Sequence, residues 1–200
     1  MQSKNIKIAI TGGIGSGKTA VSDIIAGRGY KVLSCDKIYF ELLSQGAFNA
    51  ALKQEFGNVF LSDGSLDRAQ LSARVFNNEA ELKKLNKITH PIIMQTVMGR
   101  LNGVGLNFCE VPLLFENGFE SLFDAVIVVL RDIKERIAAV VKRDGLSEKD
   151  VENRINQQYN YNNLDLTKYY VLHDCCNLAD LELKTLEILD NIEKKYFQKK

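Results

Sequence analysis

The stretch Gly12-Gly13-Ile14-Gly15-Ser16-Gly17-Lys18-Thr19 decides the fold of this chain. It fits the phosphate-binding pattern G-x-x-x-x-G-K-[ST]. Residues 6–10 before it alternate isoleucine with Lys7 and Ala9, as a strand does, and residues 19–26 after it have the hydrophobic spacing of a helix. A strand, a glycine-rich loop and a helix in this order predict a P-loop. The alternative is a glycine-rich turn that contains a lysine by chance.

The residue types of the loop suit a bound triphosphate. Glycines let the backbone curl closely round phosphate oxygens, and the amides that open a helix favour an anion. Lys18 would neutralise the β- and γ-phosphates, and the Thr19 hydroxyl would ligate Mg²⁺. The sequence therefore predicts a protein that binds a nucleoside triphosphate. The residues expected to bind it are Gly12, Gly13, Ile14, Gly15, Ser16, Gly17, Lys18, Thr19 and Ala20.

Composition narrows the class of protein. The 200 residues suffice for one domain with helical insertions. With 26 basic and 25 acidic residues, a net charge of +1 implies no general affinity for nucleic acid or for an anionic membrane. The chain shows no leader pattern and no apolar run near the ~20 residues of a membrane span. We expect a cytoplasmic protein that acts on small molecules as a monomer or weak homo-oligomer, without nucleic-acid or membrane partners.

The four cysteines form no C-x-x-C pair, which favours free thiols in a reducing cytosol. They are Cys35, Cys109, Cys175 and Cys176. The adjacent pair Cys175-Cys176 leaves a redox switch open as an alternative.

Short aliphatic runs alternate with helical patterns along the chain, which predicts an α/β fold with a parallel sheet. We expect a three-layer P-loop core with a five-stranded sheet, formed by residues of about 1–36, 105–132 and 166–200. A helical insertion would span about 37–104, where no strand pattern appears, and a helical lid about 133–165.

Local signals set several helix boundaries. Pro91 should kink or restart the helix in which it lies. Asp132 is expected to cap the helix over 133–143, and Ser147 with Asp150 forms a capping-box pattern at the start of the next helix.

Asp36 follows the second predicted strand. Ligands of open α/β sheets lie beyond the carboxyl ends of the strands, so this carboxylate is well placed to meet a group bound near the phosphates. The structural alternative is an N-cap for a helix over 37–43. One residue can serve both purposes.

Switches, motors and kinases all use this loop. A guanine-nucleotide switch needs D-x-x-G and N-K-x-D, and neither occurs in the sequence. A motor usually has an acidic residue after an aliphatic strand, but Asp132 is better explained as a helix cap. A small-molecule kinase needs a base, an enclosure and arginines that close over the phosphates. Asp36, the helical insertion and the helix hairpin that contains Arg136 and Arg143 supply these parts, although a solvated helix face would also explain the arginines.

In the order of its motifs the chain resembles the dephospho-CoA kinase family. The resemblance covers nearly the whole chain and rests on six elements. They are the loop Thr11–Thr19, Asp36 at the second aspartate of D-A-D, His90-Pro91, Val111-Pro112-Leu113-Leu114-Phe115-Glu116, Arg143-Asp144, and Arg154-Ile155 with Gln158.

This resemblance implies a reaction in which ATP and 3′-dephospho-CoA give ADP and CoA. It implies that Asp36 accepts the proton of the ribose 3′-hydroxyl, while Lys18, Arg143 and Mg²⁺ at Thr19 stabilise the transferring group. It also implies that the helical insertion binds CoA. His90, Pro112, Leu113 and Glu116 would then lie on the acceptor side.

Three departures from the family pattern matter. Ser34 replaces the first aspartate of D-A-D, so Asp36 serves alone, and Phe40 stands where the family often has an arginine. The family's A-D-x-V-I-x-N-x-G, which lines the adenine side, reads differently over residues 168–176. Two competing interpretations remain. The chain is another small-molecule or nucleoside monophosphate kinase, or it is a binding module that transfers no phosphate.

Overall fold

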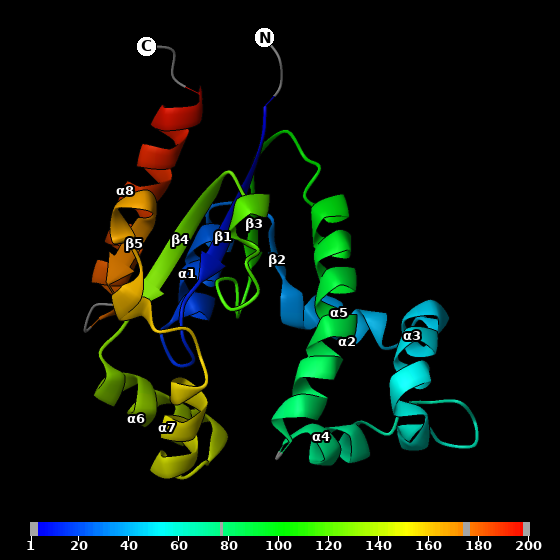
Figure 1. Cartoon of the computed structure of the whole chain (residues 1–200). Helices are drawn as coiled ribbons and strands as arrows, with labels where there is room; N and C mark the ends of the chain where they lie inside the picture. The colour runs from blue at the N-terminus through cyan, green and yellow to red at the C-terminus, as the bar shows by residue number, and fades with distance from the viewer. Residues whose placement is uncertain (1–3, 77, 174–176, 198–200) are drawn as a thin grey trace. The chain divides into compact units, whose positions relative to one another are not determined.

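The computed structural model describes residues 4–76, 78–173 and 177–197. The chain divides into two compact units, Met1–Leu33 with Leu101–Lys200, and Ser34–Arg100 (Figure 1). We call the first the sheet unit and the second the helical unit.

A five-stranded sheet forms the centre of the fold. Its strands are β1 (Asn5–Thr11), β2 (Val32–Ser34), β3 (Gly105–Glu110), β4 (Ala125–Leu130) and β5 (Tyr170–His173). The order is β2-β3-β1-β4-β5. β1 pairs in parallel with β3 and β4, and β4 pairs in parallel with β5. The predicted five-stranded parallel sheet is confirmed.

The register fixes which residues meet at the carboxyl edge of the sheet. Ile10 of β1 lies opposite Glu110 of β3, and Thr11 lies opposite Val128 of β4. Since β1 runs directly into the glycine-rich loop, the end of β3 lies beside that loop.

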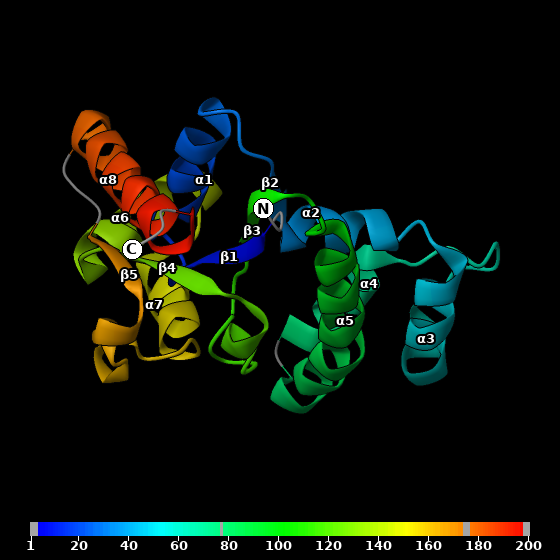
Figure 2. The same ribbon diagram turned by 90° about the horizontal axis from the view of Figure 1, so that it is seen from above.

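Helices α1 (Lys18–Gly27) and α8 (Leu178–Phe197) lie side by side against the sheet (Figure 2). Alternation along β1 directs Ile6, Ile8 and Ile10 into one buried cluster with side chains of these helices. Burial of this apolar surface, at about 25 cal/mol per Å², stabilises the base on which the loop is mounted.

Two further helices follow β4, and short 3₁₀ segments complete the sheet unit. They are α6 (Ile133–Asp144), α7 (Glu148–Asn156), and the segments Glu120–Leu122, Tyr161–Asn163 and Leu166–Lys168. Asp132 accepts a hydrogen bond from the Lys134 amide, and Ser147 accepts one from the Asp150 amide. Both predicted caps are confirmed.

Over residues 34–76 and 78–100, the helical unit contains four α-helices and the 3₁₀ turn Gly57–Val59. The helices are α2 (Cys35–Leu42), α3 (Gly46–Phe56), α4 (Arg68–Phe76) and α5 (Glu79–Arg100). The first three pack on α5. Apart from Ser34, which ends β2, the one strand-like feature among the described residues of this unit is an isolated bridge between Phe60 and Leu66.

The structure rules out two local alternatives that the sequence left open. α5 does not restart at Pro91 but continues through it. The proline removes one backbone hydrogen bond, but the buried side chains on either side, Thr89 and Ile93, hold the helix against its neighbours. Asp36 is not the N-cap of α2, because the helix begins one residue earlier and Ser34 accepts the Lys37 amide hydrogen bond instead.

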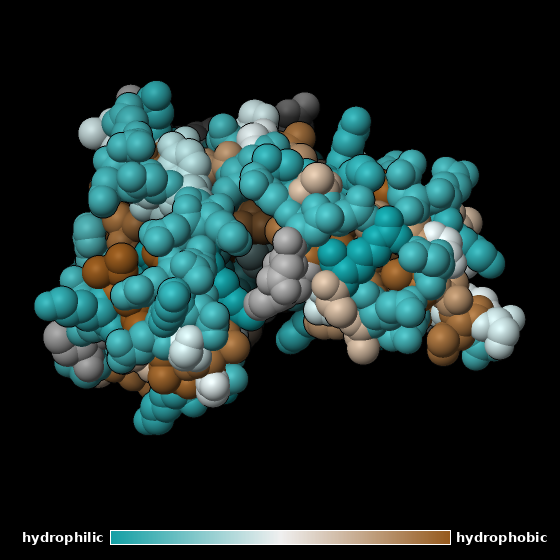
Figure 3. Space-filling view, turned by 60° about the horizontal axis from the view of Figure 1, so that its bottom comes forward, coloured by the Kyte–Doolittle hydropathy of each residue, from teal (hydrophilic) through white to brown (hydrophobic). Residues whose placement is uncertain are grey.

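Several large apolar side chains are exposed, among them Phe40, Val104 and Leu178. The face shown in Figure 3 is mostly hydrophilic, with hydrophobic residues scattered over it. None of the described helices combines the length and the apolarity that a membrane span requires.

Candidate active site

The glycine-rich loop joins β1 to α1 and needs its glycines. Gly15 has φ of 76° and Gly17 has φ of 96°, in the left-handed region. A Cβ at Gly15 would lie 2.6 Å from the backbone oxygen of Arg136, and one at Gly13 would lie 2.2 Å from that residue's guanidinium. The loop is therefore shaped both by its own backbone and by close contact with α6.

Polar groups of the loop fit a phosphate. The Ser16 Oγ is buried without a hydrogen-bond partner in the described part of the chain. Lys18 Nζ donates to the carbonyl oxygens of Gly12 (2.9 Å) and Gly13 (3.0 Å). A buried hydroxyl without a partner is costly. A bound group that carries many acceptor oxygens would satisfy it.

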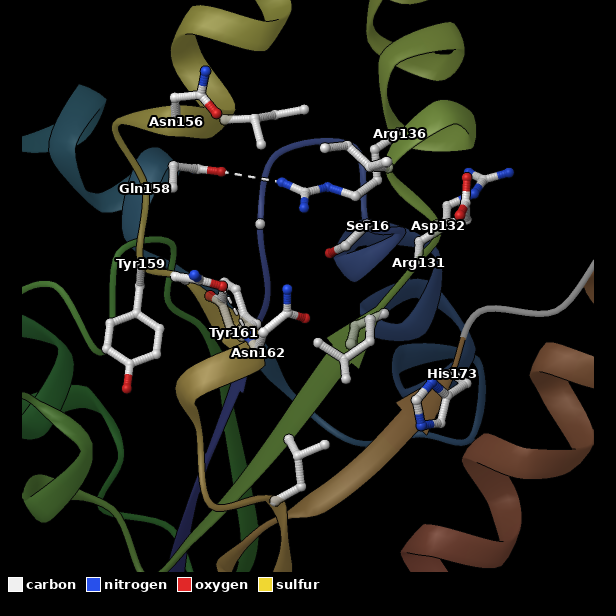
Figure 4. A pocket seen from close by; sticks show the side chains of 17 residues that line it. Ser16, Arg131, Asp132, Arg136, Asn156, Gln158, Tyr159, Tyr161, Asn162 and His173 are labelled. Carbon is white, nitrogen blue, oxygen red and sulfur yellow. Dashed lines mark hydrogen bonds between the residues drawn. The ribbon is translucent and has the colours of Figure 1, made fainter.

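The residue Gln158, which follows α7, and Arg136 of α6 both bind Ile14 of the loop. The Arg136 Nε donates to the Ile14 carbonyl at 2.8 Å, and the Ile14 amide donates to the Gln158 Oε1 at 2.7 Å. The Arg136 Nη2 donates to the same Oε1 at 3.4 Å (Figure 4). Burial lowers the pKa of Arg136 from its usual value.

A pocket of about 820 Å³ opens beside the loop, within the size range of small-molecule sites. Its lining joins Gly13, Ser16, Arg136 and Gln158 to residues that follow α7 and β5. Those labelled in Figure 4 include Tyr159, Tyr161, Asn162 and His173. The pocket thus combines a phosphate-type loop with amide and aromatic side chains.

Aromatic rings support one side of this pocket. The Phe115 ring lies 5.3 Å from that of Tyr159 and 6.0 Å from that of Tyr161. Burial raises the pKa of Tyr161 to about 12. Its hydroxyl is therefore protonated at neutral pH and can donate a hydrogen bond.

Glu110 is a site residue that the sequence analysis missed. It ends β3, and its two carboxylate oxygens accept hydrogen bonds from Thr19 (3.3 Å) and Ser22 (3.2 Å) of α1. The acidic residue that follows β4, the position expected in motors, is Asp132, which is a helix cap. The available signal was an acidic residue at the end of another buried strand.

The segment Pro112 to Glu116 follows β3 and contains a strained residue. Leu113 has φ of 57°, the one positive value among the described non-glycine residues. The Asn117 side chain donates to its carbonyl at 2.7 Å. Glu116 accepts the Tyr159 amide at 2.8 Å, which ties the segment to the pocket wall. Strain of this kind concentrates at functional sites.

Arg143 does not line the described pocket. Its side chain is 63% exposed and makes two hydrogen bonds to Asp144, of 2.6 and 2.8 Å. Arg136, two turns earlier on α6, lines the pocket together with Arg131.

Asp36 and His90 belong to the helical unit. Asp36 is exposed in the first turn of α2, and His90 is half-buried on α5.

The segment that departs from the family's adenine-side motif ends at Cys175-Cys176. The pair, with Asp174, lies outside the described residues, so the redox alternative stays a hypothesis.

The comparisons with known proteins agree on one family. The model of the family described as dephospho-CoA kinase matches residues 6–180. A dephospho-CoA kinase from Corynebacterium glutamicum is 38% identical over 160 residues, which cover 76% of this chain and 80% of the relative. One from Lactobacillus johnsonii is 30% identical over 192 residues, which cover 92% of this chain and 97% of the relative.

Solved structures give the same result. A structure from Thermus thermophilus matches with a TM-score of 0.79 and 32% identity, covering 94% of this chain and 97% of its own. A dephospho-CoA kinase from Campylobacter jejuni matches with a TM-score of 0.68 and 26% identity, covering 94% and 98%. A shikimate kinase from Acinetobacter baumannii, 11% identical with a TM-score of 0.55, covers 98% and 97% and shares the fold alone.

The matched residues contain the P-loop, its glycine contacts and the five-stranded parallel sheet. This chain therefore belongs to the dephospho-CoA kinase family, which catalyses the final step of coenzyme A biosynthesis.

Proposed function

We propose that this chain transfers the γ-phosphoryl group of ATP to the ribose 3′-hydroxyl of dephospho-CoA, which gives CoA and ADP. The observation that carries the proposal is the glycine cradle with Lys18 and the buried Ser16 hydroxyl, which has no partner among the described residues, in a chain whose family match spans residues 6–180. Phosphoryl transfer needs positioned positive charge more than covalent chemistry.

On the donor side, the loop from Gly12 to Ala20 would bind the phosphates through its amides, and Lys18 would exchange its carbonyl partners for phosphate oxygens. Arg136 lies where it can add a second positive charge. Arg143 would contribute only after it leaves Asp144, so a movement of the proposed lid over 133–165 is part of its role.

Mg²⁺ fits the residues at the end of β3. The Thr19 hydroxyl and the Glu110 carboxylate are neighbouring oxygen donors, and Mg²⁺ prefers oxygen, keeping waters and substrate phosphates as its other ligands. Two protein ligands would suffice for such an ion. The described residues contain no group of three or more His, Cys, Asp or Glu side chains that could hold a metal ion. The bound ion would neutralise phosphate charge.

On the acceptor side, Asp36 would take the proton of the 3′-hydroxyl, and His90, Pro112, Leu113 and Glu116 would contact dephospho-CoA. The helical unit would be the CoA-binding insertion. We further propose a cytoplasmic enzyme that works as a monomer or weak homo-oligomer.

The test of the reaction is ADP production from Mg-ATP with and without 3′-dephospho-CoA. The proposal predicts acceptor-dependent ADP and a product that carries a 3′-phosphate, identified by mass spectrometry. Turnover with a nucleoside monophosphate but not with dephospho-CoA would show that dephospho-CoA is not the acceptor. ATP binding without transfer to any hydroxyl acceptor would favour a binding module.

Replacing Glu110 should weaken the metal site. We expect Glu110→Gln to raise the Mg²⁺ concentration needed for half-maximal nucleotide binding about tenfold, because the carboxylate charge beside Thr19 is lost. Mn²⁺ bound with ADP, counted by electron paramagnetic resonance, reports this without turnover. Glu120→Gln, on a 3₁₀ segment of the same unit, is the control. Unchanged metal binding in Glu110→Gln would mean that Glu110 only positions α1.

Gln158 should compete with ATP for the loop. Its Oε1 holds the Ile14 amide, a group that a P-loop offers to phosphate. We expect Gln158→Ala to lower the Kd for Mg-ATP about 2- to 10-fold, as measured by calorimetry. The reason is that ATP no longer has to displace one hydrogen bond, whose net free energy corresponds to a change of this size. The neighbouring, exposed Gln157→Ala is the matched control. Weaker binding in Gln158→Ala would show that Gln158 contacts the nucleotide.

A further inference from the structure

Phe40 is an aromatic side chain that the core of the helical unit does not use. α2 buries Cys35, Ile38 and Leu42, whereas Phe40 is 55% exposed. A single exposed apolar residue needs no explanation by itself. The groups packed round this ring do.

An arginine lies over the Phe40 ring. The guanidinium carbon of Arg68, the first residue of α4, is 5.5 Å from the ring centroid. Both side chains are exposed. A guanidinium over an aromatic face is attractive, and its planar shape also stacks on other planar groups.

Tyr39 supports the same ring from inside the unit. Its ring lies 5.7 Å from that of Phe40 and 6.0 Å from that of the buried Phe48. Burial raises the pKa of Tyr39. Phe40 is therefore fixed by a contact that leads into the core, while much of its surface remains open to solvent.

The position of Phe40 relative to Asp36 gives the ring a purpose. The two residues are four apart on α2, so they share one face about 6 Å apart along the axis. In a nucleoside, the base is joined to C1′ of the same ribose ring that carries the 3′-hydroxyl. A 3′-hydroxyl at Asp36 therefore brings its base to within reach of the next helical turn.

We propose that Phe40 and Arg68 form a stacking site for the purine base of the acceptor nucleoside. The inference rests on the proposed function, since it takes Asp36 as the group that meets the 3′-hydroxyl. The site selects the acceptor by the flat face of its base, separately from the loop that binds the donor phosphates. Both residues and Asp36 lie in the helical unit.

The absence of tryptophan from the sequence allows a direct test. Phe40→Trp in the full chain places one indole at the proposed site, and Leu61→Trp places one at an exposed apolar position of the same unit. With the donor site filled by ADP, 3′-dephospho-CoA should quench the emission of Phe40→Trp with saturation and leave Leu61→Trp unchanged. No quenching in Phe40→Trp at acceptor concentrations that saturate its turnover would overturn the proposal.

Kinetics give a second test. Phe40→Ala should raise the KM for dephospho-CoA about 5- to 100-fold, the range for loss of one base–aromatic stack, with kcat and the KM for ATP nearly unchanged. Phe40→Tyr should restore the KM, and Arg68→Lys, which keeps the charge but not the plane, should raise it. Leu61→Ala is the control.

The outcomes separate this inference from the function on which it rests. If the unmodified chain makes no acceptor-dependent ADP, both fail. If it turns over and Phe40→Ala keeps its KM for dephospho-CoA, the stacking site alone is wrong. If Phe40→Ala raises the KM for ATP instead, the pair contacts the donor, and the proposal is likewise overturned.

Discussion

Asp36→Asn should lower kcat on the order of 10²- to 10⁴-fold, the contribution usual for a general acid–base group. The carboxamide keeps the size of the side chain but cannot accept the proton of the 3′-hydroxyl. Because Asp36 is exposed and Ser34, not Asp36, caps α2, the substitution leaves the helix start intact. Loss of turnover is therefore expected without loss of folding.

The measurement is steady-state ADP release with dephospho-CoA, together with calorimetric binding of Mg-ATP, which should not change. Glu41→Gln is the matched control, since it makes the same chemical change on the same helix at an exposed residue paired with Arg100. Near-normal turnover in Asp36→Asn would move the base elsewhere, with His90 or Glu116 next to be replaced. Loss of ATP binding in Asp36→Asn would show that Asp36 contributes to nucleotide binding and is not only the base.

Features of the fold that depend on neighbouring residues were predictable from sequence. The strand, loop and helix round Lys18 follow from hydrophobic spacing and glycine chemistry. The caps at Asp132 and Ser147 follow from local hydrogen bonding. The two local alternatives that the structure rules out show where such signals stop. At Pro91, packing of α5 outweighs a local cost, and at the start of α2 the cap is Ser34, two positions before Asp36.

The missed parts of the site depend on contacts between distant segments. Glu110 and Thr19 are 91 residues apart, and Ile14 and Gln158 are 144 apart. A motif identifies residue types at short range, but the partner that holds a loop amide is fixed only when sheet order and helix packing are known. Phe40 and Arg68 are 28 positions apart (68 − 40) and meet only because α2 and α4 both pack on α5.

Lys18→Met should lower kcat/KM on the order of 10²- to 10³-fold, the cost typical of removing one group that stabilises charge in a transition state. Methionine keeps an unbranched chain of similar length and removes the ammonium. The Lys18 Nζ donates to the carbonyls of Gly12 and Gly13, so Lys18 also supports the shape of the loop. The two roles predict different observables.

Loss of the phosphate contact should appear in kcat with dephospho-CoA at saturating ATP. Loss of the carbonyl contacts should lower the free energy of unfolding, measured without nucleotide. The expected decrease is about 0.5–1.5 kcal/mol per hydrogen bond before allowance for partial exposure. Lys31→Met, at an exposed position of the same unit, controls for removal of a charge. A normal kcat in Lys18→Met with reduced stability would make the lysine purely structural, and the charge on the transferring group would then have to come from Arg136 or from the metal ion.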